Sequence, residues 1–372
     1  MLVIFYGTTG ELIKLAPILK SVPREDYILV NTVQQAQQLI KLQHQLDIND
    51  DFRLANGFKG RDLENYFQAL RWLPVVIGGY LRHRSKIRRK LGSSGQNLAL
   101  VHGDTNTTVI GAVFGRMLGL PVGHIEAGLR SFDLRHPFPE EINRRIVTKL
   151  ARYHFAPGKQ PVENLKNSKG QVIDTKFNTV KDSIRLVASS TSIKLPIKPP
   201  EHYGVVSIHR NELLSNRKAL EEFLAALDDP ALQASQLIFL DHPVTRERLR
   251  SLNLDKYLDK KHITRIPKLD YPSFMKLLAK SDFVLTDSGG LQEECTYLSI
   301  PCVVHRKVTE RMEGLGENVE LTSMNAEQLI PTLERLRART AKNSKLSSIS
   351  PTQIITEYLV RHKFITERFN PF

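Results

Sequence analysis

Short apolar runs that alternate with helix-like stretches are the feature that most constrains the fold of this chain. Residues 98–101 and 121–123 are two such runs. Runs of this length bounded by glycine or proline are typical of buried parallel strands. The same alternation continues to residues 301–304 in the second half. It predicts the α/β class, with two Rossmann-like, doubly wound domains facing a cleft.

Acidic residues follow the predicted strands of the first half. Asp104 and Glu126 are each expected at the carboxyl end of a strand, where ligands bind in open α/β sheets. Glu140 opens a predicted helix with Pro139 at its first position, and Arg144 lies one turn later on the same face. Taken singly, Asp104 could be a helix N-cap, and Glu140 with Arg144 a surface pair. Three carboxylates at one rim together indicate a site.

The second half contains a predicted anion site at residues 287–290. Gly289 and Gly290 let the backbone approach a phosphate closely, and Ser288 adds a hydroxyl at the start of a predicted helix. Glu294, one turn later, can accept a hydrogen bond from a ribose diol. A plain strand-to-helix turn is the alternative explanation of this pattern.

Two further groups are expected beside that anion site. Arg306 and Arg311 follow the next strand and could clamp a diphosphate bidentately, the alternative being ion pairs with Glu310 and Glu313. His209 ends the predicted strand 203–208, and its ordinary pKa near neutrality suits acid/base work.

The net charge of +14 favours anionic partners. No nucleic-acid partner is expected, because aromatic residues are not interleaved with the basic ones as a stacking platform requires. The segment from Arg82 to Lys90 follows the apolar residues 72–81. It predicts a solvated helix face, with contact to an anionic membrane or protein as the alternative.

Several features point to a protein of the cytoplasm without a metal. No window approaches the ~20 apolar residues of a membrane span, and the N-terminus lacks the basic region of a signal peptide. Two cysteines imply no disulfide framework, and no Cys/His spacing suggests a zinc site. Residues 190–200 are the expected linker between domains 1–187 and 188–350. The segment 351–372 is expected to cross back to the first domain.

The chain resembles the non-hydrolysing UDP-N-acetylglucosamine 2-epimerases, which have a two-domain fold similar to glycosyltransferase B (GT-B). The matching motifs run in order through both halves, at residues 102–105, 124–130, 139–144, 209–210, 287–294 and 309–311. The resemblance implies a reaction without any cofactor, feeding cell-surface polysaccharide synthesis. A base removes the C2 proton while UDP leaves C1 by anti elimination, and re-addition gives the manno epimer. It also implies a homodimer.

The resemblance assigns roles by matching position. The implied acid/base residues are Asp104, Glu126, Glu140 and His209. The residues implied to bind the UDP-sugar are Lys14, Arg144, Phe274 (or nearby Tyr271), Ser288, Gly289, Gly290, Glu294 and Arg311.

The chain departs from the family pattern at three places. Thr9 stands where the family's first loop has arginine, Gln35 where it has histidine after glutamine, and Phe177 where it has glycine before Asn-Thr. These departures weigh against regulation by UDP-N-acetylglucosamine. A hydrolysing epimerase, a GT-B glycosyltransferase and a non-catalytic nucleotide-sugar-binding protein are the alternatives that remain.

Overall fold

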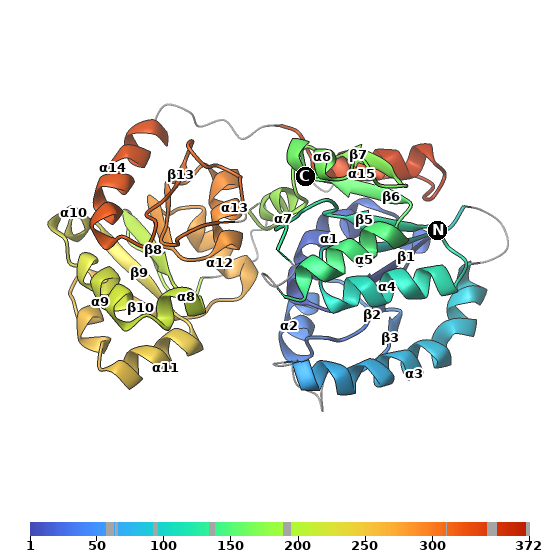
Figure 1. The fold of residues 1–372 in the computed structure, drawn as a ribbon, viewed down its shortest axis with the longest axis horizontal. Coiled ribbons are helices and arrows are strands. Elements are labelled where there is room, and N and C mark those ends of the chain that lie inside the picture. The colour runs from blue at the N-terminus through green and yellow to red at the C-terminus, as the bar shows by residue number, and fades with distance from the viewer. Residues whose placement is uncertain are drawn as a thin grey trace. The chain divides into compact units, whose positions relative to one another are not determined.

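The chain folds into two compact α/β units, Met1–Leu186 with Ile349–Phe372 (unit 1) and Val187–Ser348 (unit 2) (Figure 1). The computed structural model describes residues 1–56, 63, 66–91, 96–133, 138–188, 195–309, 311–340 and 348–369. Each unit has a parallel sheet with helices between most successive strands, which confirms the predicted fold class. The expected linker 190–200 lies partly outside the described residues.

Unit 1 contains a seven-stranded sheet in the order β3-β2-β1-β4-β5-β6-β7. Its strands are β1 Leu2–Tyr6, β2 Tyr27–Asn31, β3 Phe52–Arg53, β4 Leu98–His102, β5 Val122–Ile125, β6 Tyr153–Ala156 and β7 Gln171–Asp174. Its helices are α1 Thr9–Ser21, α2 Gln37–Leu46, α3 Tyr66–Leu91, α4 Asn106–Met117, α5 Glu140–Leu150, α6 Lys159–Asn164, α7 Val180–Ala188, which runs into unit 2, and α15 Pro351–Arg361. The strand order reverses between β1 and β4, which makes this the switch point.

Two apolar layers hold the sheet of unit 1. On one face, residues of α1, α2 and α15 pack against alternate side chains such as Ile4 and Leu100. On the other face, α3, α4 and α5 pack against the intervening ones, such as Phe5 and Val101. Gly111 lets α4 lie close to the sheet, because a Cβ there would be 2.6 Å from Cβ of Phe5.

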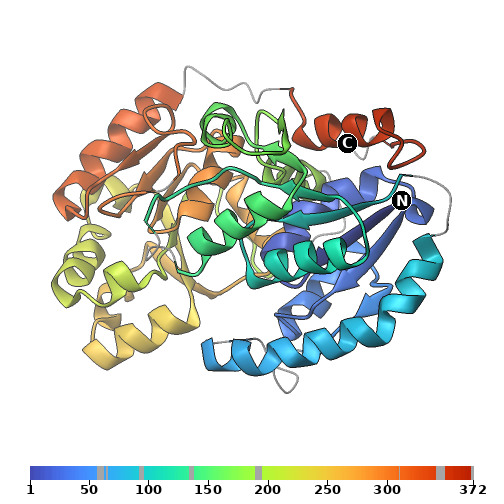
Figure 2. The same cartoon turned by 45° about the vertical axis from the view of Figure 1, so that its right-hand side comes forward.

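Helix α3 contains both the apolar segment and the basic segment noted in the sequence. It runs unbroken through the apolar residues 72–81 and the basic residues 82–90 (Figure 2). Trp72 and Tyr80 are buried against the sheet, whereas most of the basic side chains are exposed. No described helix is long and apolar enough to span a membrane.

Helix α2 begins at Gln37, so Gln35 is not part of it. Gln35 is held instead by the loop after β1: its backbone N–H donates to the carbonyl of Gly7, at 2.8 Å. Its side-chain Oε1 accepts from the backbone N–H and the hydroxyl of Thr9, at 2.7 and 2.9 Å. These bonds keep residue 35 out of the helix.

Unit 2 repeats the arrangement with a six-stranded sheet in the order β10-β9-β8-β11-β12-β13. Its strands are β8 Tyr203–Ser207, β9 Gln236–Asp241, β10 Ile263–Pro267, β11 Phe283–Thr286, β12 Cys302–Val304 and β13 Val319–Leu321. Its helices are α8 Asn211–Leu214, α9 Arg217–Ala226, α10 Pro230–Gln233, α11 Pro243–Leu252, α12 Tyr271–Leu278, α13 Gly289–Leu298 and α14 Leu329–Thr340. The switch point lies between β8 and β11.

Candidate active site

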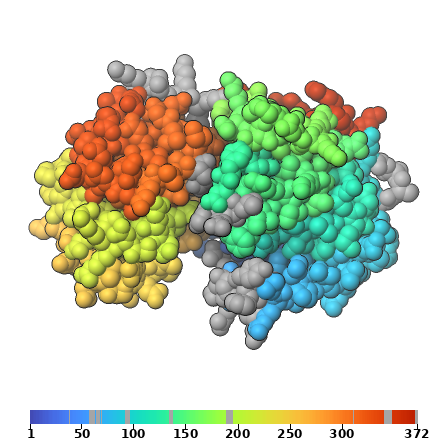
Figure 3. All heavy atoms as spheres, in the orientation of Figure 1, coloured from blue at the N-terminus to red at the C-terminus, as the bar shows by residue number. Residues whose placement is uncertain are grey.

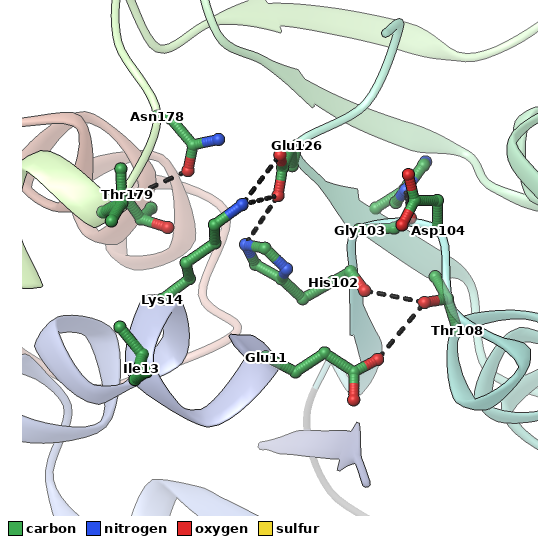
Figure 4. Close-up of polar contacts among 12 residues, drawn as sticks. Glu11, Ile13, Lys14, His102, Gly103, Asp104, Thr108, Glu126, Asn178 and Thr179 are labelled. Carbon is green, nitrogen blue, oxygen red and sulfur yellow. Dashed lines mark hydrogen bonds and ion pairs between the residues drawn. The ribbon is translucent and has the colours of Figure 1, made fainter. Parts of the chain in front are cut away.

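The loops after β1, β4 and β5 meet at the switch point of unit 1, and Figure 4 shows the polar side chains there. Lys14 of α1, His102 of β4 and Glu126 point toward one another, and Asp104 lies beyond the end of β4. Parallel strands end at the same edge of a sheet, so residues far apart in sequence come together. The structure thus has Asp104 and Glu126 at one edge of the sheet, together with Lys14.

Glu126 has a backbone conformation that is rare for a residue with a side chain. Its φ is +65°, in the left-handed region, immediately after β5. Such a conformation persists only when its surroundings hold it in place, and these cases cluster at functional sites. The Glu126 side chain is only 6% exposed, and Nζ of Lys14 lies 2.8 Å from Oε1 and 2.6 Å from Oε2. Lys14, expected to hold phosphate, therefore neutralises Glu126 in this structure.

Asp104 has its own cationic partner. Nε and Nη2 of Arg144 donate to Oδ2 of Asp104 at 2.9 and 2.6 Å. The side-chain amide of Asn143 donates to the Asp104 carbonyl at 2.9 Å, which fixes the backbone. The N-cap of α4 is Thr105, so the N-cap explanation of Asp104 is wrong.

The alternative in which Glu140 and Arg144 form a surface pair is wrong. Arg144 turns instead to Asp104, with Glu141 3.6 Å away, and Glu141 also accepts from Arg145. Pro139 is the N-cap of α5 rather than its first helical residue, and Oε2 of Glu140 is buried without a hydrogen bond to any described residue. The i,i+4 spacing allowed the pair, but the carboxylate at the end of β4 competes better for the guanidinium.

Glu11 is a buried carboxylate that sequence reasoning missed. Its Oε2 accepts from the backbone N–H groups of Gly7 and Thr8, each at 2.9 Å, and its Oε1 accepts from Oγ1 of Thr105 at 2.6 Å. Burial raises the pKa of Glu11. Glu11 therefore connects the loop after β1 to the start of α4 through hydrogen bonds. The capping-box spacing from Thr8 to Glu11 was the available signal.

In unit 2, Asp287 organises the end of β8. Its carboxylate accepts from the backbone N–H groups of His209 and Arg210 at 2.8 to 3.0 Å. The rings of His209 and His242 lie 4.7 Å apart. Burial, then the charges of Arg210 and Lys268, lowers the pKa of His209 to about 4. The expectation that His209 titrates near neutrality is wrong for this structure, because burial among cations favours the neutral ring.

The predicted anion turn forms the start of α13. Ser288 is its N-cap, with the side chain accepting from the backbone N–H of Leu291, and Gly289 and Gly290 are its first residues. A Cβ at Gly290 would meet only Oγ of Ser288, at 3.8 Å, so the space beside this backbone is open. Exposed N–H groups at a helix start suit an anion.

The other expected binding residues lie on α12 or α13 or follow β12. Nη1 of Arg311 is 2.8 Å from Oε2 of Glu293, and Glu310 lies outside the described residues. Nε of Arg306 lies 3.4 Å from Oε2 of Glu212.

Phe274 and Glu294 are both half-buried. The charges of Glu294 and Glu293 add to burial in raising the pKa of Tyr271. Among the described residues, no group of three or more His, Cys, Asp or Glu is arranged to hold a metal ion.

Residues 82–352 match the sequence profile of the family described as UDP-N-acetylglucosamine 2-epimerase. The chain is 29% identical to the UDP-N-acetylglucosamine 2-epimerase of Methanococcus maripaludis over 90% of each chain. It is 30% identical to the enzyme of the same name from Bacillus subtilis, over 93% of this chain and 89% of the relative. The crystal structure of Methanocaldococcus jannaschii UDP-GlcNAc 2-epimerase in complex with UDP-GlcNAc and UDP superposes with a TM-score of 0.70, at 26% identity, over 97% of this chain and 99% of that one.

Proposed function

This chain belongs to the UDP-N-acetylglucosamine 2-epimerase family, and we propose that it interconverts UDP-N-acetylglucosamine and UDP-N-acetylmannosamine without hydrolysing them. The observation that carries the proposal is the pair of acids at the ends of β4 and β5, each paired with its own cation, Asp104 with Arg144 and Glu126 with Lys14. No redox cofactor is needed, because elimination and re-addition change no oxidation state overall.

The reaction proceeds in two balanced steps. In the first, one carboxylate takes the C2 proton, the C1–O bond breaks, and UDP leaves with the bonding electrons to give a 2-acetamidoglucal. In the second, a protonated acid returns a proton to C2 from the opposite face while the UDP oxygen re-forms the bond to C1. We assign these transfers to Asp104 and Glu126, and we propose that Glu140, at the start of α5, is a third acid/base residue.

Release from their paired cations would make the two carboxylates stronger bases. A carboxylate bound to an ammonium or guanidinium group is a weak base, because the cation stabilises its charged form. A diphosphate competes for the same cations. We assign Lys14 and Arg144 to the diphosphate in the bound state, which would free Glu126 and Asp104 to accept protons.

The remaining residues that we assign to UDP belong to unit 2. The backbone N–H groups of Gly289 and Gly290 and the Ser288 hydroxyl, at the start of α13, are the donors that we assign to phosphate oxygens. Arg311 adds positive charge, Glu294 accepts from the ribose, and Phe274 packs on uracil. His209, neutral and close to Arg210, donates to the leaving diphosphate or shuttles a proton.

Product analysis tests the proposal. The protein is incubated with UDP-N-acetylglucosamine, and the products are followed by proton NMR. We expect UDP-N-acetylmannosamine to accumulate to a constant ratio with total UDP-sugar conserved, and Asp104→Asn to slow this about 100-fold or more. Free N-acetylmannosamine plus UDP would instead show the hydrolysing reaction. An unchanged substrate would refute the epimerase assignment for this sugar.

We also propose that the protein is a homodimer, through the face of unit 1 formed by α3, α4 and α5, which Figure 3 shows in blue to green. Apolar side chains that are 37–55% exposed occur on all three helices: Leu70, Leu73, Val75, Ile77 and Leu81, Val113 and Met117, and Ile146. Exposed apolar patches of this kind mark association surfaces. Light scattering should give twice the 42.3 kDa chain mass, and Ile77→Glu with Leu81→Glu should give a monomer. A monomeric unmodified protein would contradict this proposal.

The basic end of α3 is the other surface with a proposed partner. Arg84 and Arg88 donate to the Met117 carbonyl, at 3.4 and 3.3 Å, and Lys90 pairs with Asp51. Part of the segment therefore serves the fold, and we propose that the remaining charge, as on Arg89, contacts anionic partners in the cytoplasm. The two free buried cysteines fit that compartment. From the proposed epimerase reaction we further propose that the protein supplies an N-acetylmannosamine donor for the synthesis of cell-surface polysaccharides.

A further inference from the structure

His102 is a buried histidine beside the proposed acid/base residue Glu126, and the proposed mechanism leaves it unused. It ends β4 and is 2% exposed. Its Nε2 lies 3.5 Å from Oε2 of Glu126. Nε2 makes no hydrogen bond with any described residue, although a buried ring nitrogen normally has a partner. Figure 4 shows the His102 ring next to the end of the Lys14 side chain, with both directed at the Glu126 carboxylate.

The surroundings of His102 make its ring a neutral donor. Burial is the main reason that the pKa of His102 falls to about 3, with Lys14 and His124 adding to the effect and Glu126 opposing it. A neutral imidazole carries a single N–H. The carboxylate of Glu126 can only accept, so the tautomer with hydrogen on Nε2 fits this position. The backbone of His102 is held by Thr108, whose Oγ1 donates to its carbonyl at 2.7 Å.

We infer that His102 is a positioning residue for Glu126, which takes over the carboxylate when Lys14 leaves it for an anionic substrate. The inference rests on the proposed function of Glu126. The closest Nζ–Oε2 distance, 2.6 Å, belongs to the lysine, and the 3.5 Å contact of the imidazole is a little beyond hydrogen-bond length. A shift of the carboxylate by about 0.5 Å would give an ordinary N–H···O bond.

A neutral donor has an advantage over a second cation at this place. A cation would stabilise the charged carboxylate strongly and so lower its affinity for the C2 proton. A neutral N–H fixes the orientation of the carboxylate at a smaller loss of basicity. Orientation matters because proton transfer from carbon requires the base to lie in line with the C–H bond.

Two matched variants test the inference. His102→Gln keeps an N–H donor near the position of Nε2, whereas His102→Met has a side chain of similar length without a donor. For His102→Met we expect kcat to fall about 10- to 100-fold, with KM for UDP-N-acetylglucosamine changed less than about twofold. The acidic limb of the kcat profile should move to higher pH, because the charged carboxylate loses a donor. His102→Gln should restore kcat to within about threefold of the unmodified protein.

Equal losses in the two variants, or a loss that follows a lowered unfolding midpoint, would overturn the inference in favour of a packing role. The tautomer gives a second readout that needs no turnover. Imidazole ¹⁵N NMR of the unmodified protein, with the His102 signals assigned from His102→Gln, should show hydrogen on Nε2 and a downfield proton shift on addition of UDP. Hydrogen on Nδ1 would overturn the inference. Absence of epimerisation by the unmodified protein would instead refute the proposed function.

Discussion

The ion pair of Lys14 and Glu126 predicts a large energetic coupling that a double-mutant cycle can measure. Removing one partner of a buried pair leaves an uncompensated charge, at a cost of about 3–5 kcal/mol. With its side chain 6% exposed, Glu126 has little access to water, so Lys14→Met should cost about 3 kcal/mol. The Lys14 side chain is 18% exposed and can reach water more easily, so Glu126→Gln should cost about 1–2 kcal/mol.

The double variant removes both charges together. We expect Lys14→Met with Glu126→Gln to be destabilised by at least about 2 kcal/mol less than the sum of the single variants. Trp72 provides the assay, because it is the only tryptophan of the chain and is buried in unit 1. Urea unfolding followed by its fluorescence reports on the unit that contains the pair. A coupling below about 0.5 kcal/mol would refute the reasoning, because independent sites add within that margin.

Three further predictions concern single substitutions. Gly79→Ala should lower the unfolding free energy by about 3 kcal/mol or more, because its Cβ would lie 1.9 Å from the Leu54 carbonyl oxygen. The control Gly78→Ala, at the adjacent position with open space around it, should be neutral or stabilising by up to about 1 kcal/mol. Similar urea midpoints for the two variants would contradict this prediction. Burial lowers the pKa of His154 to about 4, so between pH 6.5 and 4 the unfolded chain binds a proton that the folded chain does not. The free energy of unfolding should therefore decrease as the pH is lowered from 6.5 to 4. In His154→Leu this decrease should be smaller, and an identical slope would count against a neutral His154 ring in the folded protein. Asp104→Asn should lose kcat about 100-fold or more with urea stability changed by less than about 1.5 kcal/mol, and retained turnover would remove Asp104 from the proton transfers.

The positions at which the strands end could be predicted, because they depend on residues close together in the sequence. Apolar runs of three or four residues, each followed by a polar cluster, predicted Asp104 and Glu126 at strand ends, and both lie there in the structure. The Gly-Gly turn at Ser288 likewise formed the start of a helix, as the glycines indicated. Positions within one element and its following loop follow from periodicity and turn chemistry.

Partners across elements could not be predicted in the same way. The spacing of four suggested Glu140 for Arg144, but Asp104, 40 residues away, is its partner. The pKa of His209 depends on burial and on cations that the fold brings near it, such as Lys268. Each is a tertiary effect: many partners satisfy a helical spacing equally well, and only the packed structure selects among them.

The central claim is that this chain removes and returns the proton at C2 of a UDP-linked 2-acetamido sugar. Solvent exchange tests it most directly: the protein is incubated with UDP-N-acetylglucosamine in D₂O, and C2 is examined by NMR and mass spectrometry. The account predicts one deuterium at C2 of the epimerised product and, as the reaction returns, of the remaining substrate. An epimerised product that retains its C2 protium, or a substrate that never exchanges in the active protein, would contradict it.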